Sequence, residues 1–360
     1  MSKIKRYKKQ CSAAVLLLIF SMIILCFHNS VHAKQNIKMK TKKLVLVSGE
    51  SKKLKVSGMK KNGKIHWKSS NKKVVSVSQK GKVRAKKNGK AVVTAKYKNK
   101  KVKCSVTVVS KANAKQNPKE ITVGTSYYRN FLVDNIYHSG KNGDIHYHVY
   151  FPDSYDGKKK MALYITLPGY QGLYFQGVAE NLKTEDFGFE AMKYNPDMVI
   201  LAPQLDDWGQ KSADQTIALT EYFLQHYAID ASKVYINGYS GGGETLSLVL
   251  GKKPKLFTRA LMCSSQWDGA YEPVVKAKTP VYFVIGESDE YYSSKPFKQA
   301  YQKLHDLYQK QGLSEKQIGK LLVLDVKDST YFKGTGITYQ HGGGYLFCRD
   351  QKIMNWLFEK

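Results

Sequence analysis

The stretch Val234–Gly243, with the sequence VYINGYSGGG, decides the fold of the larger part of this chain. An apolar run with the character of a strand leads into Gly238-x-Ser240-x-Gly242, and helical spacing follows. A serine in a sharp strand-to-helix turn exposes its hydroxyl, and the flanking glycines avoid clashes between the two elements. The pattern predicts a nucleophilic Ser240, with the amide of Gly241 as a donor to an oxyanion.

Apolar strands and amphipathic helices alternate on both sides of this turn. Strands are expected at residues 144–151, 161–167, 198–202, 233–237, 259–263, 281–286 and 321–325. Helices are expected at residues 212–227, 242–250, 296–311 and 351–358. The alternation predicts an α/β fold, with a mostly parallel sheet covered by helices on both faces.

A nucleophilic serine needs a base, and the base needs an acid that orients it. When the serine lies in a turn of this kind, the order along the chain is Ser, then Asp or Glu, then His. Only His305 and His341 follow Ser240. His305 falls inside a predicted helix, whereas His341 lies in a glycine-rich loop before the last helix, so His341 is the predicted base.

The orienting acid is expected just beyond the strand at 281–286. Asp289 has that position and is the predicted acid. Three other carboxylates are rivals for the role: Glu287, Glu290 and Asp268.

The body of the chain, residues 121–360, resembles the α/β-hydrolase superfamily. The resemblance rests on residues 227–235 (YAIDASKVY), on residues 238–243 (GYSGGG) and on residues 202–204 (APQ). It is closest to the secreted esterases and predicted peptidases related to prolyl oligopeptidase and polyhydroxyalkanoate depolymerase. It implies a serine hydrolase without a cofactor or a metal, and leaves esters and peptides both open as substrates.

The second oxyanion donor is expected in the loop after the strand at 161–167. The backbone amides of Tyr170 and Gln171 are the candidates, and Tyr170 is taken as the donor. Members of the superfamily usually carry His-Gly in this loop, and this chain carries Pro168-Gly169 instead.

The 360-residue chain divides sharply by charge. Residues 1–118 hold 32 of the 59 Lys and Arg residues and a single acid, Glu50. Residues 119–360 carry equal numbers of acidic and basic side chains. We therefore expect two parts with different tasks, a basic module followed by a neutral body.

Short alternating strands separated by glycine turns fill residues 44–109, which predicts a small β-sandwich. This stretch resembles the bacterial immunoglobulin-like domain, group 2. The resemblance rests on residues 67–71 (WKSSN), 81–85 (GKVRA) and 89–95 (GKAVVTA). It places the domain at residues 36–110 and a polar linker at 111–120, and it implies no catalysis in the module.

Lysines alternate with apolar residues along the strands of the basic module, which places them on the solvent face. Charged strands resist edge-to-edge pairing, so the lysines serve solubility in one interpretation. In the other they bind an anionic cell-wall polymer or acidic polysaccharide. Nucleic acid is not expected as a partner of an exported protein.

Residues 1–33 have the pattern of a bacterial signal peptide, with five basic residues, an apolar run at 13–27 and Val31-His32-Ala33 before the cleavage site. The run is shorter than the ~20 residues of a membrane span, although an uncleaved signal anchor remains an alternative. We expect a secreted or cell-surface protein that meets the membrane only through this segment.

Cys104, Cys263 and Cys348 remain after removal of the signal peptide. They form no Cys-x-x-Cys pair and no zinc-binding pattern, so no metal site is predicted. A bridge between Cys263 and Cys348 and a pair of buried thiols are both open.

The expected activity is hydrolysis of carboxylic esters, with acylated polysaccharide as the expected substrate. The alternatives are a serine peptidase of the prolyl oligopeptidase type and a surface-binding protein with an inactive hydrolase body. Aromatic residues gather in the loops at the carboxyl ends of the strands: Tyr170, Tyr174, Phe175, Trp208, Trp267, Tyr271, Tyr291, Tyr292 and Tyr345. They form a rim for sugar rings or an aromatic acyl group, or they reflect a composition with 25 Tyr.

Overall fold

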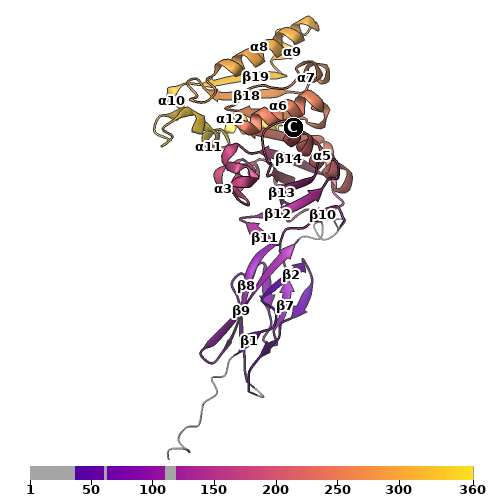
Figure 1. The fold of residues 1–360 in the computed structure, drawn as a ribbon, viewed down its shortest axis with the longest axis vertical. Helices are drawn as coiled ribbons and strands as arrows, with labels where there is room; N and C mark the ends of the chain where they lie inside the picture. The colour runs from indigo at the N-terminus through magenta and orange to yellow at the C-terminus, as the bar shows by residue number, and fades with distance from the viewer. Residues whose placement is uncertain (1–36, 61–62, 110–118, 360) are drawn as a thin grey trace, which may run out of the picture.

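The fold is that of a computed structural model, which describes residues 37–60, 63–109 and 119–359. Figure 1 shows an elongated molecule in which a slender β module leads into a larger α/β body. The predicted signal peptide, residues 1–33, lies outside the described residues, as does most of the predicted linker at 111–120. Within the described ranges, no helix is long and apolar enough to cross a membrane.

The basic module is a β-sandwich, as predicted. Its strands are β1 (Lys38–Met39), β2 (Lys43–Val47), β3 (Ser51–Lys53), β4 (Val56–Ser57), β5 (His66–Ser69), β6 (Val75–Val77), β7 (Lys82–Ala85), β8 (Gly89–Tyr97) and β9 (Lys100–Val109). One sheet has the order β2-β9-β8-β5, another has the order β3-β7-β6, and β1 pairs with β4. Along β8, Ala91, Val93 and Ala95 enter the core while Lys90 and Lys96 face solvent, which is the alternation of a strand with one buried face.

A mixed sheet forms the centre of the body. Its strands are β10 (Ile121–Thr122), β11 (Ser126–Tyr128), β12 (Phe131–His138), β13 (Asp144–Tyr150), β14 (Met161–Leu167), β15 (Met198–Pro203), β16 (Ile229–Tyr239), β17 (Arg259–Cys263), β18 (Val281–Gly286) and β19 (Leu322–Lys327). The order is β10-β12-β13-β15-β14-β16-β17-β18-β19, with β11 beside β12. The six strands β14 to β19 run parallel, so their carboxyl ends share one edge of the sheet.

The predicted strands of the body are all present, whereas β10, β11 and β12 were not predicted. For β12, the strand was missed because of a bulge: its pairing with β13 shifts register between Leu132 and Asn135. Asp134 has a φ of 60° at this bulge. The extra residue breaks the alternation of apolar and polar side chains by which a strand is recognised in a sequence.

Helices cover both faces of the sheet, as predicted. The α-helices are α3 (Glu180–Thr184), α4 (Phe187–Ala191), α5 (Gln210–His226), α6 (Gly241–Lys252), α7 (Glu272–Ala277), α8 (Lys295–Lys310), α9 (Glu315–Ile318), α10 (Ser329–Phe332), α11 (Gly344–Phe347) and α12 (Gln351–Phe358). Short 3₁₀ helices are η1 (Tyr170–Gly172), η2 (Tyr174–Gln176), η3 (Pro254–Leu256) and η4 (Gln340–Gly343). Helices α5 to α8 share one core with the sheet, and α3, α4, α11 and α12 share the other.

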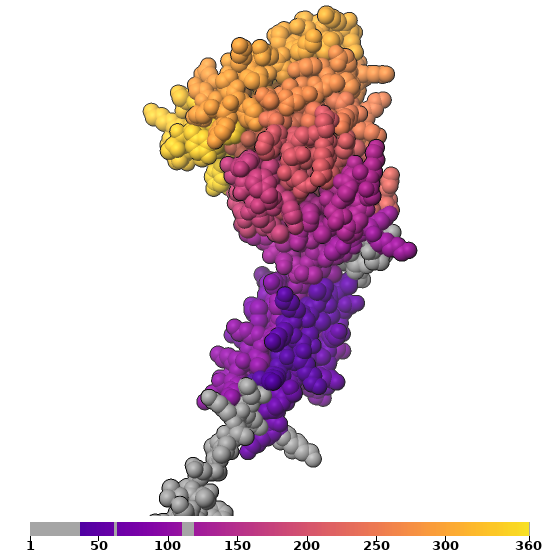
Figure 2. All heavy atoms as spheres, viewed as in Figure 1, coloured from indigo at the N-terminus to yellow at the C-terminus, as the bar shows by residue number. Residues whose placement is uncertain are grey.

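The module meets the body end to end (Figures 1 and 2). The hydroxyl of Thr107 donates to the carbonyl of Thr125 at 2.8 Å, and Val109 joins the larger core of the body. Lys87 and Asp153 form an ion pair of 2.6 Å that is exposed to solvent and therefore contributes little.

The three cysteines within the described residues are free thiols, and all three are buried. Cys263 and Cys348 lie in the same core, where burial raises the pKa of Cys348 to about 12. Of the two alternatives left open by the sequence, the structure therefore shows buried thiols.

This arrangement predicts the thiol chemistry of the chain without residues 1–33. A maleimide should react slowly with the native protein, because no thiol is exposed, and should add three times after unfolding without reductant. Intact-protein mass spectrometry measures both results. A single addition that rises to three only after reduction would show a disulfide.

Candidate active site

Ser240 lies in a strained turn between β16 and α6. Its φ is 55° and its ψ is −128°, a conformation that costs a non-glycine residue about 1–3 kcal/mol. The Ser240 amide donates to the Cys263 carbonyl at 3.0 Å, and the Ser265 hydroxyl donates to the Ser240 carbonyl at 2.7 Å. These bonds to the end of β17 and the residues after it hold the backbone of the turn, so its side chain is presented at the edge of the sheet.

The two outer glycines of the motif allow the strand and the helix to approach each other. A Cβ atom on Gly238 would lie 2.2 Å from the Gly242 carbonyl oxygen. A Cβ atom on Gly242 would lie 2.5 Å from the carbonyl oxygen of Leu167. Both distances are far below van der Waals contact with backbone atoms, so only glycine fits at either position.

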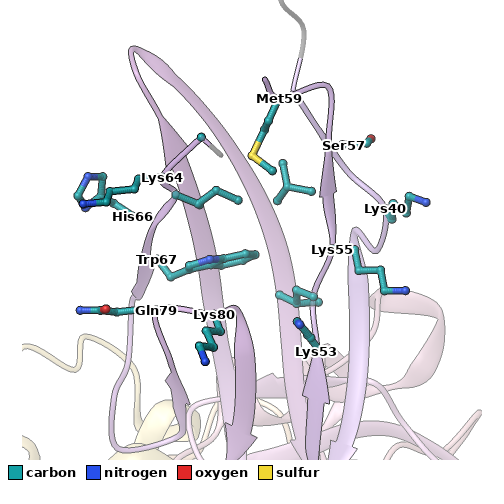
Figure 3. A pocket seen from close by; sticks show the side chains of 14 residues that line it. Lys40, Lys53, Lys55, Ser57, Met59, Lys64, His66, Trp67, Gln79 and Lys80 are labelled. Carbon is teal, nitrogen blue, oxygen red and sulfur yellow. The ribbon is translucent and has the colours of Figure 1, made fainter. Parts of the chain in front are cut away.

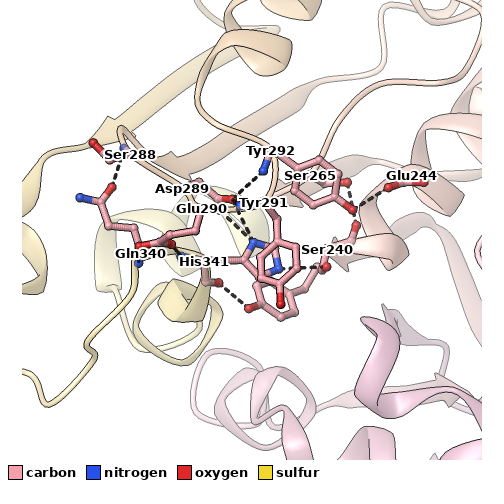
Figure 4. Close-up of polar contacts among 11 residues, drawn as sticks. Ser240, Glu244, Ser265, Ser288, Asp289, Glu290, Tyr291, Tyr292, Gln340 and His341 are labelled. Atoms are coloured by element: carbon pink, nitrogen blue, oxygen red, sulfur yellow. Dashed lines mark hydrogen bonds and ion pairs between the residues drawn. The ribbon is translucent and has the colours of Figure 1, made fainter.

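Ser240, His341 and Asp289 form a continuous hydrogen-bonded chain (Figure 4). The His341 Nε2 atom lies 3.1 Å from the Ser240 hydroxyl. Its Nδ1 atom lies 3.1 and 3.0 Å from the two carboxylate oxygens of Asp289. Because Nδ1–H donates a hydrogen bond to the Asp289 carboxylate, Nε2 is left as the acceptor for the hydroxyl proton of Ser240.

Asp289 is buried directly beyond β18, with 4% of its surface exposed. One of its oxygens accepts the amides of Tyr291 and Tyr292 at 3.0 Å each. Burial alone would raise the pKa of Asp289, but the hydrogen bonds from His341 and from the Tyr292 amide hold it below its usual value. The side chain is therefore a carboxylate at neutral pH, fixed in orientation toward the imidazole.

The loop that carries His341 is tied to the same region by two further side chains. The carboxylate of Glu290 accepts hydrogen bonds from the backbone amides of Gln340 and His341, both at 2.9 Å. The Tyr239 hydroxyl donates to the His341 carbonyl at 2.5 Å, and its ring stacks near the imidazole. These contacts fix the position of the imidazole from the backbone as well as from Asp289.

The rivals for the predicted roles have other partners or are exposed. Glu290 holds backbone amides, Glu287 is exposed, and the exposed Asp268 accepts the side-chain amide of Gln266. His305 lies on α8 and pairs with Glu315 at 2.9 Å. Of these candidate acids and bases, Asp289 and His341 are the ones that hydrogen bonds link to Ser240.

The two predicted oxyanion donors are backbone amides at the starts of short helical segments. Gly241 begins α6 and Tyr170 begins η1, and within the described residues neither amide donates to a protein acceptor. The loop of Tyr170 touches the turn, because a Cβ atom on Gly169 would lie 3.2 Å from the Ser240 Cβ. The oxyanion role of Tyr170 and Gly241 remains a prediction that this geometry supports.

Glu185 lies beneath the Tyr170 loop and was missed by the sequence analysis. Its carboxyl group accepts the Gly169 amide at 2.7 Å. Burial raises the pKa of Glu185 to about 8, and the hydrogen bond from Gly169 opposes that shift. Burial is the main cause that raises the pKa values of Tyr239 and Cys263, and the negative charge of ionised Glu185 adds to both shifts. No sequence signal distinguishes Glu185, because it follows a short polar helix and its partner is a backbone amide.

The described residues contain no group of three or more His, Cys, Asp or Glu side chains that could hold a metal ion.

Comparisons with known proteins agree with both parts of the chain. Residues 33–108 match the bacterial Ig-like domain (group 2), and residues 205–268, which include Ser240, match the prolyl oligopeptidase family. No curated protein matches the chain.

Among solved structures, a thermostable esterase is similar at 16% identity and a TM-score of 0.51, covering 79% of this chain and 76% of that one. Est1E from Butyrivibrio proteoclasticus has 14% identity and a TM-score of 0.37, covering 52% of this chain and 85% of its own. Oligopeptidase B from Leishmania major has 11% identity and a TM-score of 0.42, covering 85% of this chain and 45% of its own. The body thus has the α/β-hydrolase fold, which it shares with the thermostable esterase.

The pKa of Glu185 generates a prediction about pH. The group is neutral below pH 8 and becomes an anion above it, next to the loop that is expected to stabilise an oxyanion. An ionised Glu185 would repel the negative oxyanion, so kcat/KM for a soluble ester should fall about three- to tenfold as the pH rises through 8. The control is Glu185→Gln, which keeps an acceptor for the Gly169 amide and cannot ionise. Superimposable alkaline profiles of the two proteins would contradict the assignment.

Proposed function

We propose that this chain, which joins an immunoglobulin-like domain to an α/β-hydrolase body, hydrolyses carboxylic esters through a covalent acyl-enzyme. The hydrogen-bonded chain from Asp289 through His341 to Ser240 carries the proposal. It supplies a nucleophile, a base and an orienting carboxylate in the order that acyl transfer requires.

The reaction takes place in two stages, acylation and deacylation of Ser240. The Ser240 oxygen forms a bond to the acyl carbon while its proton passes to His341 Nε2, and the carbonyl electron pair moves onto the oxygen that the two amides stabilise. The ester bond then breaks, and His341 gives its proton to the departing alkoxide. Water repeats the sequence on the acyl-enzyme, which releases the carboxylic acid and restores Ser240.

Esters rank above peptides because an alcohol leaves more readily than an amine. Peptide hydrolysis requires accurate protonation of a poor leaving group. Peptidase activity is the second candidate, favoured by the match of residues 205–268 to the prolyl oligopeptidase family.

An acylated polysaccharide outside the cell is the proposed natural substrate. The signal-like residues 1–33 support export, and the immunoglobulin-like domain accords with a place at the bacterial surface.

The activity assignment predicts a clear pattern among variants. Ser240→Ala and His341→Ala should each lower kcat on a 4-nitrophenyl ester by about 10⁴-fold or more, because triad members act as a unit. His305→Ala, a histidine outside the chain of contacts, is the matched control and should retain the wild-type rate. The same proteins are assayed on acetylated xylan and on peptide amides. Turnover of peptides without turnover of esters would reverse the ranking.

The basic module is proposed to hold the protein on an anionic cell-wall polymer or acidic polysaccharide. Within residues 37–60 and 63–109, Glu50 is the one acidic side chain, and Lys87 is the one lysine with an ion pair. The other lysines therefore present an uncompensated positive field, which attracts polyanions over a Debye length of about 8 Å at physiological salt.

We place polymer binding at a groove of about 900 Å³ in the basic module. Its lining includes Lys40, Lys53, Lys55, Lys64, Lys80, His66, Met59 and Trp67, and no acidic side chain. Figure 3 shows the Trp67 ring and apolar side chains across the middle, with Lys40 and Lys55 on one side and Lys64 and His66 on the other. A sugar ring can stack on the indole while its carboxylates reach the lysines at the edges.

Charge reversal tests the groove against diffuse attraction. Lys40→Glu/Lys55→Glu/Lys64→Glu should abolish retention on polygalacturonate at low salt, and salt should release the wild type. Lys96→Glu/Lys101→Glu/Lys103→Glu, on β8 and β9, changes the net charge equally and should retain most binding. Equal losses would mean that net charge alone binds the polymer. Retention by both variants would make the lysines solubility devices.

A further inference from the structure

Large apolar side chains are exposed in a cluster beside the Ser240 turn. Tyr170, Phe175 and Trp208 are 49%, 61% and 40% exposed. The ring centres of Tyr170 and Phe175 are 5.5 Å apart, and those of Tyr170 and Trp208 are 6.1 Å apart. Contiguous exposed apolar surface on a soluble protein marks a site where something binds.

The cluster adjoins the atoms that would react. The Cβ and Cγ atoms of Trp208 lie 3.2 Å from where a Cβ atom on Gly241 would be, so the indole covers the first residue of α6. The ring of Tyr170 belongs to the cluster, and its backbone amide, at the start of η1, is the predicted oxyanion donor. A group bound on these rings would therefore lie beside the start of α6, next to the residue that carries the nucleophile.

The direction of proton transfer determines on which side of the site the alcohol and the acyl group of an ester must lie. The leaving oxygen must face His341 Nε2, because that atom returns the proton. The ring of Tyr291 lies on this side, 4.5 Å from the imidazole. The aromatic cluster lies instead on the side of Gly241 and the Tyr170 loop, which leaves it for the acyl part of the substrate.

The geometry of the rings points to the chemistry of the acyl group. Tyr170 meets Phe175 at 68° and Trp208 at 65°, so the rings form a corner and not one flat face. A planar ring in a corner stacks on one wall and presents its edge to the other, the two arrangements that aromatic pairs prefer.

The polar groups beside Trp208 are already engaged. Asp207 accepts the Ser212 hydroxyl at 2.6 Å and the Gly209 amide at 3.0 Å, and Asp206 pairs with Lys211 at 2.8 Å. Among the described residues, a sugar in the corner would find the Tyr170 hydroxyl and the Trp208 indole N–H free for its hydroxyl groups, but not the two carboxylates. An aromatic acid needs few such partners.

We propose that Tyr170, Phe175 and Trp208 form an acyl subsite for a planar aromatic acid, so that the substrate is an arylacyl or arylpropenoyl ester of an alcohol. The inference rests on the proposed ester hydrolysis and specifies its acyl group. The subsite acts by holding the ring, while the covalent steps remain those of Ser240 and His341.

Two esters of one alcohol, methyl cinnamate and methyl acetate, test the subsite in the full-length protein. Trp208→Ala and Phe175→Ala should each lower kcat/KM for the cinnamate about five- to tenfold, mainly through KM, and leave the acetate within about twofold. Trp208→Phe should restore most of the loss. Val178→Ala, which removes another exposed apolar side chain of the same loop, is the matched control and should change neither ester.

The outcomes separate the subsite from the hydrolase. Equal losses on both esters, or a wild-type preference for the acetate, would overturn the aromatic acyl subsite while leaving ester hydrolysis in place. A preference for acetylated xylan that depends on Trp208 would show that the rings bind sugar, and would also overturn it. Failure of the wild type on every ester would remove the proposed function itself.

Discussion

The backbone conformation of Ser240 is the constraint on which the rest of the site depends. A non-glycine residue at a φ of 55° persists only where its surroundings hold it, and here β16, α6 and the residues after β17 do so. The close approach of Gly238 to Gly242 removes any room for relaxation. One turn thus fixes the hydroxyl, the start of α6 and the contact with the Tyr170 loop together.

The loop that carries His341 is hydrogen-bonded to this turn, although about a hundred residues separate the two in sequence. Asp289 orients the imidazole, Glu290 binds the loop backbone, and Tyr239, the residue before the nucleophile, holds the His341 carbonyl. Consecutive acids after β18 therefore have separate tasks, one on the side chain and one on the backbone.

The fold and the meeting of the three side chains could be predicted because their signals are local. The strand–turn–helix pattern around Ser240 and the position of Asp289 after an apolar strand need no tertiary information. Strand β12 escaped prediction because the bulge at Asp134 disrupts its period. Glu185 escaped prediction, and Glu290 was considered only as a rival acid, because their partners are backbone amides, which carry no residue identity. The corner of Tyr170, Phe175 and Trp208 forms only when two loops meet.

Covalent capture of the nucleophile tests the central claim most directly. A fluorophosphonate is added to the full-length protein, and the adduct is located by mass spectrometry after trypsin digestion. Lys233 and Lys252 flank the turn, so the account predicts one adduct on the peptide of residues 234–252, at Ser240, and none in Ser240→Ala. An adduct on another residue, or ester hydrolysis by a protein that forms no adduct, would contradict it.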